Sequence, residues 1–364
     1  MDNPIIIDGS QGEGGGQMLR SALTMSAVTG TPFEMINIRA NRSVPGLKRQ
    51  HLTCVRAMAT LCDAAVTGDT INSQHLTFHP GTIKAGKYRF EIGTAGSVTL
   101  VAQTVLPALL FAKDASTVVI RGGTHVPMSP TWDFFVHTYL PQLRAMGADV
   151  TAKLRQYGFY PAGGGEIVLT ILPWQKADPI KLFTRGEKIE TWITAKVSHL
   201  ALGIASTEAR IVYDQLPGRN MRLDVDTVAA PGPGNYCTLT VKDKNITAVF
   251  SEIGTYGKSR KAVANRVAQQ AKTYLRAQFV ADTYLSDQLL LPIVLAADLI
   301  PPESPYWGCF TMPTKHSQHF DSNWAILKLF RRDCAMIERP HPHCKYTTTV
   351  YIGKEGIINE MGTN

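Results

Sequence analysis

The chain has 364 residues, of which 44% are hydrophobic and 18% are charged, and its formal net charge is +8. These values are typical of a globular protein with two or three domains, and no run approaches the eighteen apolar residues of a membrane span. The positive excess is compatible with a nucleic acid or a phosphorylated substrate as partner. Six scattered cysteines and the absence of a signal-peptide pattern predict free thiols in a cytoplasmic protein.

Residues 5–20 predict a buried strand, a glycine loop and the start of a helix. Five glycines fall within residues 9–16, and a helical pattern begins at Gln17. Such a loop aims free backbone N–H groups and the positive end of a helix dipole at one spot, where an anion is favoured. Phosphate binding and a tight turn that only lets strand and helix pack are both open at this point.

The glycine loop does not match the standard nucleotide-binding motifs. A Walker loop ends in Gly-Lys-Ser/Thr, whereas Gly16 is followed by Gln17 and Met18, and the dinucleotide fingerprint fails at the same glutamine. The charged side chains nearby are Glu13 and Arg20. A carboxylate next to a bound phosphate suggests a bridging metal ion, because two bare anions would repel each other.

Helices are expected to alternate with strands along the rest of the chain. The expected helices cover residues 17–29, 47–62, 98–111, 131–146, 261–279, 284–295 and 323–332. The expected strands cover residues 32–40, 63–68, 75–79, 88–92, 116–121, 167–169, 191–197, 222–227, 236–242, 306–312 and 347–352, and a further strand is expected to open at residues 147–150. This alternation favours an α/β fold over an all-β fold or a helical bundle.

The order of elements recurs, which predicts an α/β (α+β) fold of three repeated units with two helices and four strands each. The first helices of units one and two start about 80 residues apart, and those of units two and three about 190 residues apart. The excess of about a hundred residues fits a small inserted domain. We expect one domain of residues 1–184 and 279–364, and an inserted α/β domain of residues 185–278.

Several predicted turns carry side chains suited to phosphate chemistry. Arg39, Arg42, Lys48 and Arg49 fall within eleven residues, and guanidinium groups match phosphates geometrically. A solvated charged loop is the alternative. Turns of repeated units lie on shared faces, so these residues can converge with others that are distant in the sequence.

Three other stretches each have two interpretations. Residues 153–161 interleave basic and aromatic side chains, which could stack single-stranded nucleic acid or pack against a sheet. Residues 163–165 are three glycines before a strand pattern, and we expect a turn. The His-Pro-His-Cys stretch at 341–344 has metal-ligand residue types but no partner cluster, so we expect an exposed turn.

His319 lies just before the expected last helix, which Ser322 or Asn323 could cap. A helix N-terminus disfavours an imidazolium, so a histidine there stays available as a neutral nucleophile or base. A plain surface histidine is the alternative, and His316, three residues earlier, competes for the same role.

Several of these stretches are motifs that occur together in one known protein family. They are residues 8–17 (DGSQGEGGGQ), 39–42 (RANR), 45–47 (PGL), 50–52 (QHL), 93–97 (GTAGS), 158–165 (GFYPAGGG) and 287–289 (DQL). In combination they resemble the RNA 3′-terminal phosphate cyclases over nearly the whole chain, most weakly in the insert and after His319. The fold of that family has three repeated α/β units and an inserted domain, which agrees with the expectation above.

The resemblance implies a nucleotidyl-transferring ligase that uses ATP and Mg²⁺ (or Mn²⁺) on RNA with a 3′-phosphate end. A histidine attacks the α-phosphate and gives histidine–AMP and pyrophosphate, and the AMP then passes to the RNA 3′-phosphate. The adjacent 2′-hydroxyl displaces AMP and leaves a 2′,3′-cyclic phosphate. DNA lacks that hydroxyl and cannot complete the reaction.

The resemblance also implies roles for individual residues. His319 is the implied nucleophile, because residues 319–323 match a His-x-x-Thr-Asn pattern with serine in place of threonine. Glu13 is the implied metal-linked carboxylate, and Pro130 and Tyr284 are the implied adenine sandwich. The residues implied around the nucleotide are Glu13, Gln17, Arg20, Arg39, Arg42, Gln103, Pro130, Tyr284, Asp287 and Gln288.

Departures from the family pattern leave alternatives open. Residues 312–319 are longer than the family pattern by a couple of residues, which keeps His316 as a second candidate nucleophile. A catalytically inactive relative that binds RNA in ribosome biogenesis is the alternative function, although the presence of His319, Glu13 and Arg42 argues against it. An enolpyruvyl transferase would need six units where three are visible. A homodimer is also left open.

Overall fold

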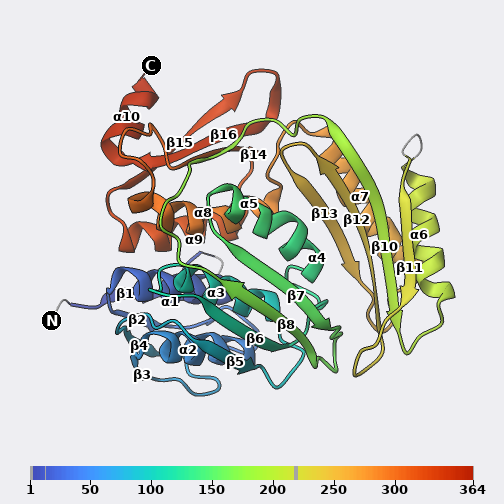
Figure 1. Cartoon of the computed structure of the whole chain (residues 1–364), viewed down its shortest axis with the longest axis horizontal. Coiled ribbons are helices and arrows are strands. Elements are labelled where there is room, and N and C mark those ends of the chain that lie inside the picture. Colours follow the sequence, from blue (N-terminus) through green and yellow to red (C-terminus); the bar gives the residue numbers. More distant parts are fainter. Residues whose placement is uncertain (1–2, 13, 217–219, 364) are drawn as a thin grey trace.

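The computed structural model describes residues 3–12, 14–216 and 220–363, along which helices and strands alternate (Figure 1). The helices are α1 (Gly16–Thr29), α2 (Arg49–Cys62), α3 (Val98–Leu109), α4 (Trp132–Phe134), α5 (Leu140–Ala145), α6 (Gly203–Gln215), α7 (Arg260–Arg276), α8 (Thr283–Leu295), α9 (Gln318–Phe330) and α10 (Glu355–Thr363). The strands are β1 (Ile5–Asp8), β2 (Phe33–Ile36), β3 (Ala65–Thr67), β4 (Leu76–His79), β5 (Lys87–Glu91), β6 (Ser116–Gly122), β7 (Val150–Gln156), β8 (Gly165–Ile171), β9 (Ile180–Leu182), β10 (Lys188–Ser198), β11 (Arg222–Thr227), β12 (Gly234–Asp243), β13 (Thr247–Ile253), β14 (Gly308–Pro313), β15 (Cys334–His341) and β16 (Cys344–Lys354).

These strands form four sheets of four strands each. Three sheets share one order and direction, in which a parallel pair at one edge continues into two antiparallel pairs. They are β1-β2-β4-β3, β5-β6-β8-β7 and β9-β14-β16-β15. The fourth sheet, β11-β10-β12-β13, is built entirely from residues between β9 and α8.

The mixture of helices and mixed sheets confirms the predicted α/β (α+β) class. We interpret the pattern shared by three sheets as three related units, with the fourth sheet entering between β9 and α8. The repeat itself, and the division into residues 1–184 with 279–364 and residues 185–278, remain predictions.

Helix α1 is enclosed by other helices. It packs against α2, α3, α8 and α9, and its side chains Leu19, Leu23 and Met25 are fully buried. Gly30 ends the helix in the left-handed conformation, at φ 72°, and its N–H donates to the Ser26 carbonyl at 2.9 Å. The start of α1, directly after the glycine loop, is therefore held within the main hydrophobic core.

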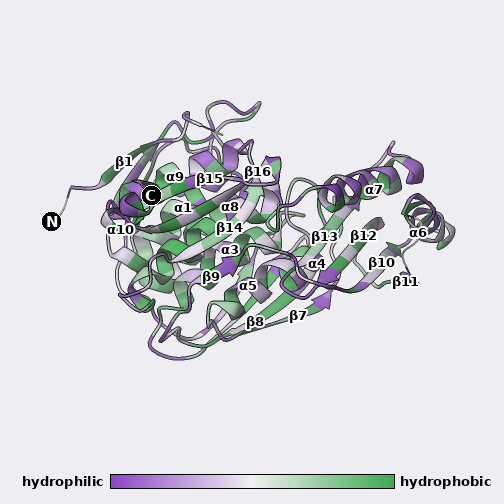
Figure 2. Ribbon diagram, turned by 90° about the horizontal axis from the view of Figure 1, so that it is seen from above, coloured by the Kyte–Doolittle hydropathy of each residue, from purple (hydrophilic) through white to green (hydrophobic). Residues whose placement is uncertain are grey.

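The fourth sheet has a hydrophobic cluster of its own. Helices α6 and α7 cover one face of the sheet, at the end of the molecule opposite the N-terminus in both views (Figures 1 and 2). Val212, Leu239 and Val267 are buried between the helices and the sheet. Strand β13 packs against α4, where Ser251 shares a hydrogen bond of 3.1 Å with Thr131. These contacts join the fourth sheet to the second unit.

Five elements were not predicted from the sequence: β9, α6, β13, β15 and α10. Helix α6 buries only Ala205, Glu208, Ala209 and Val212, so its sequence carries little apolar periodicity. Strand β15 passes from a buried to an exposed end and lacks strict alternation. Such elements are fixed by their neighbours rather than by a pattern of their own.

Two predicted helices differ in their limits. The helix expected over 131–146 is divided by a π-helical turn (Phe135–Tyr139) just before Pro141, which has no N–H to donate. The helix expected over 323–332 begins five residues earlier. All six cysteines are free, as predicted. Within the described residues, no helix is both long and apolar enough to cross a membrane.

Candidate active site

The glycine loop lies against two other helices. A Cβ added to Gly12, which has φ +57°, would collide with the Ser322 hydroxyl of α9. A Cβ added to Gly16 would collide with the His51 ring in the first turn of α2. Glycine is therefore needed here for close approach, and the loop is more than a link between β1 and α1. Glu13 lies outside the described residues, so its role as metal-linked carboxylate remains a prediction.

The first turns of α1 present polar side chains to a small cavity. Arg20 donates to Gln17 Oε1 at 2.6 Å, and Gln17 in turn donates to the Ser21 hydroxyl at 3.5 Å. Burial lowers the pKa of Arg20, against the opposing effect of Asp287. The cavity is lined by Gln17, Arg20, Ser21, Gln103, Tyr139, Gln288, Leu291 and Asn323. Four of the predicted residues thus converge from α1, α3 and α8.

A pair of amides joins α3 to α8 at this cavity. Gln103 Nε2 donates to Gln288 Oε1, and Gln288 Nε2 donates to the Tyr284 carbonyl at 2.7 Å. Asp287, one residue earlier, is buried. Its burial, with the nearby Asp282 carboxylate, raises the pKa of Asp287 well above its usual range, and Arg20 opposes that shift. This carboxyl therefore favours its neutral form.

Helix α9 places His319 differently from the prediction. The Ser317 hydroxyl caps the helix by accepting from the Phe320 N–H at 3.0 Å, so His319 lies in the first turn. The expectation that Ser322 or Asn323 caps the helix is wrong, because the earlier cap starts the helix sooner. Both residues lie inside α9, and both are buried.

Asn323 ties α9 to two other helices. Its Oδ1 accepts from the Ser21 hydroxyl of α1 at 2.6 Å, and its Nδ2 donates to the Asp287 carbonyl of α8 at 2.7 Å. Neither side chain of this bridge was among the predicted site residues. Ser21 gives no signal in the sequence, because a serine within a helix most often faces solvent or its own backbone.

His319 and His316 have opposite electrostatic surroundings. Partial desolvation, together with Arg20 and Arg42, lowers the pKa of His319, although the residue is exposed. His316 contacts Asp321 through Nδ1 at 2.8 Å and Glu338 through Nε2 at 3.0 Å. Burial lowers the pKa of His316, but these two carboxylate hydrogen bonds outweigh it, and the net shift is upward. His319 is thus the neutral ring, and both nitrogens of His316 are engaged.

His51 is the most strongly perturbed histidine of the site. It lies in the first turn of α2, and its Nδ1 accepts from the Lys48 N–H at 3.2 Å. Burial and surrounding cations lower the pKa of His51 to about 3; the cations are Arg20, Arg39, Lys48 and Arg42. Sequence reasoning did not include His51 among the site residues, although it belongs to the 50–52 motif. Four cations therefore lie close enough to His51 to disfavour its charged form.

The two arginines of the 39–42 motif have different surroundings. Arg39 donates from one guanidinium nitrogen to the Gly46 carbonyl at 2.8 Å and to the Val44 carbonyl at 3.1 Å, so it closes its own loop. Arg42 is exposed and near enough to lower the pKa of both His51 and His319. The phosphate-binding role predicted for both residues remains a prediction.

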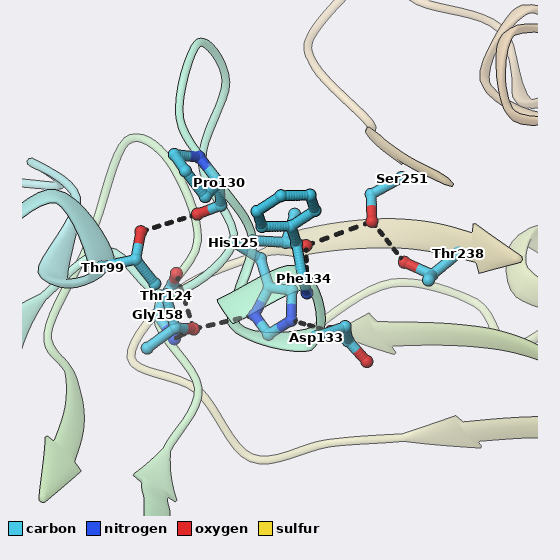
Figure 3. A network of polar contacts seen from close by, with 10 residues as sticks. Thr99, Thr124, His125, Pro130, Asp133, Phe134, Gly158, Thr238 and Ser251 are labelled. Atoms are coloured by element: carbon cyan, nitrogen blue, oxygen red, sulfur yellow. Dashed lines mark hydrogen bonds and ion pairs between the residues drawn. The ribbon is translucent and has the colours of Figure 1, made fainter. Parts of the chain in front are cut away.

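Pro130 and Tyr284, the expected adenine sandwich, lie on different elements. The Pro130 carbonyl accepts from the Thr99 hydroxyl of α3 at 2.7 Å, and the next residue, Thr131, is linked through Ser251 to the fourth sheet (Figure 3). Tyr284 is 57% exposed at the start of α8. Among the described contacts none joins the two rings directly, and the sandwich remains a prediction.

A buried histidine fixes the loop that carries Pro130. His125 is fully buried, with Nε2 2.8 Å from Asp133 Oδ2 and Nδ1 2.8 Å from the Thr124 hydroxyl (Figure 3). Its ring stacks on Tyr236 of β12 with centroids 4.0 Å apart. We assign this cluster a structural role, because every polar atom of the ring is engaged within the fold.

The three other stretches adopt structural roles. Tyr157 and Phe159 stack in the interior around His125, so for these aromatics the packing interpretation of residues 153–161 is right. Gly163 and Gly164, both at positive φ, connect a turn at residues 160–162 to β8, which begins at Gly165, so the predicted turn lies slightly earlier than expected. Residues 341–344 form the tip of the β15–β16 hairpin. Within the described part of the chain, no group of three or more His, Cys, Asp or Glu side chains could hold a metal ion.

Comparisons with known proteins agree with this geometry. A family model described as RNA 3′-terminal phosphate cyclase matches residues 11–334. A protein of that name from Salmonella typhimurium is 42% identical over 326 residues, covering 90% of this chain and 93% of its own. One from Ralstonia nicotianae is 44% identical over 329 residues, covering 90% and 91%, and one from Koribacter versatilis is 42% identical over 330 residues, covering 90% of each.

Proposed function

The chain belongs to the RNA 3′-terminal phosphate cyclase family, and from this premise we propose that it uses ATP to convert an RNA 3′-terminal phosphate into a 2′,3′-cyclic phosphate. One observation carries the proposal beyond the family name. An exposed His319 lies in the first turn of α9, whose Ser322 lies against Gly12 of the glycine loop, and burial together with the nearby Arg20 and Arg42 lowers its pKa. This is the arrangement that a nucleophile needs in order to attack a polyanion.

The first step is transfer of AMP to His319. A lone pair of the ring attacks the α-phosphorus, an N–P bond forms, and the bond to the bridging oxygen breaks to release pyrophosphate. Only the neutral ring has that lone pair, so a lowered pKa of His319 keeps the nucleophile available. His316 is less suited, because both of its nitrogens contact carboxylates.

The pocket supplies charge and orientation to that step. Arg20 can hold phosphate oxygens and offset the charge that develops on the departing pyrophosphate. Gln17 and Gln103 add neutral donors in the same cavity. Free N–H groups at the start of α1, directly after the glycine loop, extend the anion site.

The second and third steps use the RNA itself. An oxygen of the RNA 3′-phosphate attacks the adenylyl phosphorus and displaces His319, which regains its lone pair. The 2′-hydroxyl of the terminal ribose then attacks the 3′-phosphorus, loses its proton, and displaces AMP. The phosphate oxygen becomes a good leaving group only after adenylation, which accounts for the use of ATP.

Glu13 is the one residue that we propose as a metal ligand. Magnesium usually keeps several waters and binds one or two carboxylates together with phosphate oxygens, so it does not need a cage of protein ligands. Glu13 with the nucleotide phosphates would suffice to hold Mg²⁺ or Mn²⁺, which would supply charge neutralisation. We further propose that residues 1–184 and 279–364 form the catalytic domain, because every residue given a role here lies in them.

Product analysis tests this function. A 3′-phosphorylated RNA is incubated with ATP and magnesium, and its end is then challenged with a phosphatase. We expect the end to become phosphatase-resistant only when ATP is present. The matched control is the same RNA with a 2′-deoxy terminal nucleotide, which should accept AMP but not cyclise, so its resistant end should retain label from ATP radiolabelled at the α-phosphate, whereas the cyclised end should not. An RNA end that stays phosphatase-sensitive, with protein that is folded and binds ATP, would favour the non-catalytic RNA-binding alternative.

A further inference from the structure

The positive charge of the chain is concentrated around the fourth sheet. Residues 185–278 contain 14 of the 37 Lys and Arg residues but only 8 of the 29 Asp and Glu residues. This segment therefore carries +6 of the formal net charge of +8, and the remainder of the chain is nearly neutral. None of the chemistry proposed above uses this charge.

Helix α7 holds much of the excess. It contains five basic residues and no acidic residue, and its buried face is formed by apolar side chains together with Tyr274. Arg260 and Lys261 lie in its first turn, where the positive end of the helix dipole disfavours cations and acidic residues are usual. Glu208 of α6 lies near enough to Arg260 to interact with it, but no described carboxylate pairs with Lys261. A first turn with two cations and no acidic residue breaks this local rule and points to an external anion.

Three of the cations on α7 face solvent and have no partner in the described part of the chain. Arg260 bonds the Thr207 hydroxyl, and Lys272 bonds Gln215, both on α6. By contrast, no described residue pairs with the three exposed cations Lys261, Arg266 and Arg276. At 100° per residue these three lie within about 140° of one another around the helix, and they span about 22 Å along it. They form one strip along the exposed side of α7, a helix on which many residues are hydrophilic (Figure 2).

An aromatic side chain stands beside this strip. Tyr256 lies in the loop between β13 and α7, three residues before the Ser259 cap, and is fully exposed at 108%. Within the described residues, no ring contact involves Tyr256. Basic side chains that track a backbone, next to an exposed aromatic ring on which a base can stack, are the features of surfaces that bind single-stranded nucleic acid.

We propose that α7 and the Tyr256 loop form a docking surface for the RNA substrate, upstream of its 3′ end. The strip of Lys261, Arg266 and Arg276 would contact backbone phosphates, and Tyr256 would stack on a base. This inference rests on the proposed function, because it takes RNA to be the substrate. The segment inserted between β9 and α8 would hold the RNA while the candidate active site modifies its 3′ end.

The test compares RNAs of different length. The triple variant Lys261→Gln/Arg266→Gln/Arg276→Gln is assayed for cyclisation of 3′-phosphorylated RNAs of about 3 and about 20 nucleotides. The control variant Lys87→Gln/Lys113→Gln/Lys176→Gln removes the same charge from exposed lysines outside the segment. We expect KM for the long RNA to rise roughly tenfold in the α7 variant only, with kcat and the short RNA unaffected.

Salt dependence gives a second readout. Loss of three phosphate contacts to a single strand should make the slope of log affinity against log salt shallower by about 2. For stacking, Tyr256→Ala should weaken binding of the long RNA at least about fivefold, whereas Tyr346→Ala, another exposed tyrosine, should not.

Direct binding separates this inference from the proposed function. Anisotropy of a labelled RNA of about 20 nucleotides, measured without ATP, reports docking alone. If the wild type makes no cyclic product but binds RNA more tightly than the α7 variant, the proposed function fails and the docking surface stands. If cyclisation is normal and the α7 variant binds and reacts like the control variant, the docking surface is refuted.

Discussion

His316 and His319 are three residues apart at the start of α9, and the fold gives them opposite properties. His316 is held between the carboxylates of Asp321 and Glu338, which favour its charged form. His319 faces Arg20 and Arg42, which favour its neutral form. Burial lowers the pKa of both rings, and the difference between them comes from neighbouring charges, most of which the chain brings in from α1, the 39–42 loop and β15.

Among the variants proposed here, the removal of Arg20 should have the largest effect on the rate of AMP transfer to His319. In Arg20→Met the pocket loses a half-buried cation that lowers the pKa of His319 and that we propose shields phosphate. We expect the rate of AMP transfer to fall by about 10² or more, as for removal of a charged donor at a developing anion. The matched control is Arg210→Met, which removes an arginine paired with Asp214 on α6. A loss below tenfold would contradict the role of Arg20.

A glycine pair tests the contact between the loop and α9. Gly12→Ala and Gly30→Ala both place a side chain at positive φ, and each should cost about 1 kcal/mol in free energy of unfolding. Only at Gly12 would the new Cβ meet a neighbour, the Ser322 hydroxyl, one turn after His319. We expect Gly12→Ala alone to lose roughly tenfold in AMP transfer, because small misplacements at a reacting centre are costly. Equal activity in both variants would show that the loop does not position α9.

The titration of the two histidines gives a smaller but direct signal. NMR of ring-labelled protein should place the pKa of His319 below 6.5 and that of His316 above it. Because the neutral His319 is the reactive form in the proposed mechanism, the rate of AMP transfer should persist below pH 6.5 and fall only at lower pH. A His319 that titrates above 6.5 would remove the electrostatic argument for its role.

The smallest effect concerns the stability that His316 provides. Its folded-state pKa is raised, so its contribution is fully present below the unfolded value of about 6.5 and is lost as the pH rises through the folded value. Glu338→Gln should therefore destabilise the protein more at pH 5.5 than at pH 8, by about 0.5 kcal/mol for a partly exposed pair. Urea unfolding at both pH values measures this, and the exposed Glu303→Gln serves as the control. A pH-independent loss would contradict the proposed pairing.

Local patterns in the sequence were enough to predict part of the site. The strand, glycine loop and α1 follow from residues 5–29 alone, and with them the placement of Gln17 and Arg20 beside the loop. The meeting of Gln103 with Gln288 could be anticipated only through the resemblance, because 185 positions separate them. Helix starts were less predictable: a cap at Ser317 was enough to move His319 into a helix.

What the sequence could not provide depends on tertiary contacts. The bridge from Ser21 through Asn323 to Asp287 needs three helices to be packed before it exists. The carboxylate that engages one nitrogen of His316 comes from β15, a strand without a clear alternating pattern. The low pKa of His51 likewise needs cations from three segments. These interactions are long-range, and no local periodicity encodes them.

Covalent labelling tests the central claim most directly. The wild type, His319→Ala and His316→Ala are incubated with magnesium and ATP radiolabelled at the α-phosphate, and are then resolved on a denaturing gel. We predict label on the wild type and on His316→Ala, and none on His319→Ala. Label that persists in His319→Ala and disappears in His316→Ala would contradict the account and move the nucleophile to His316.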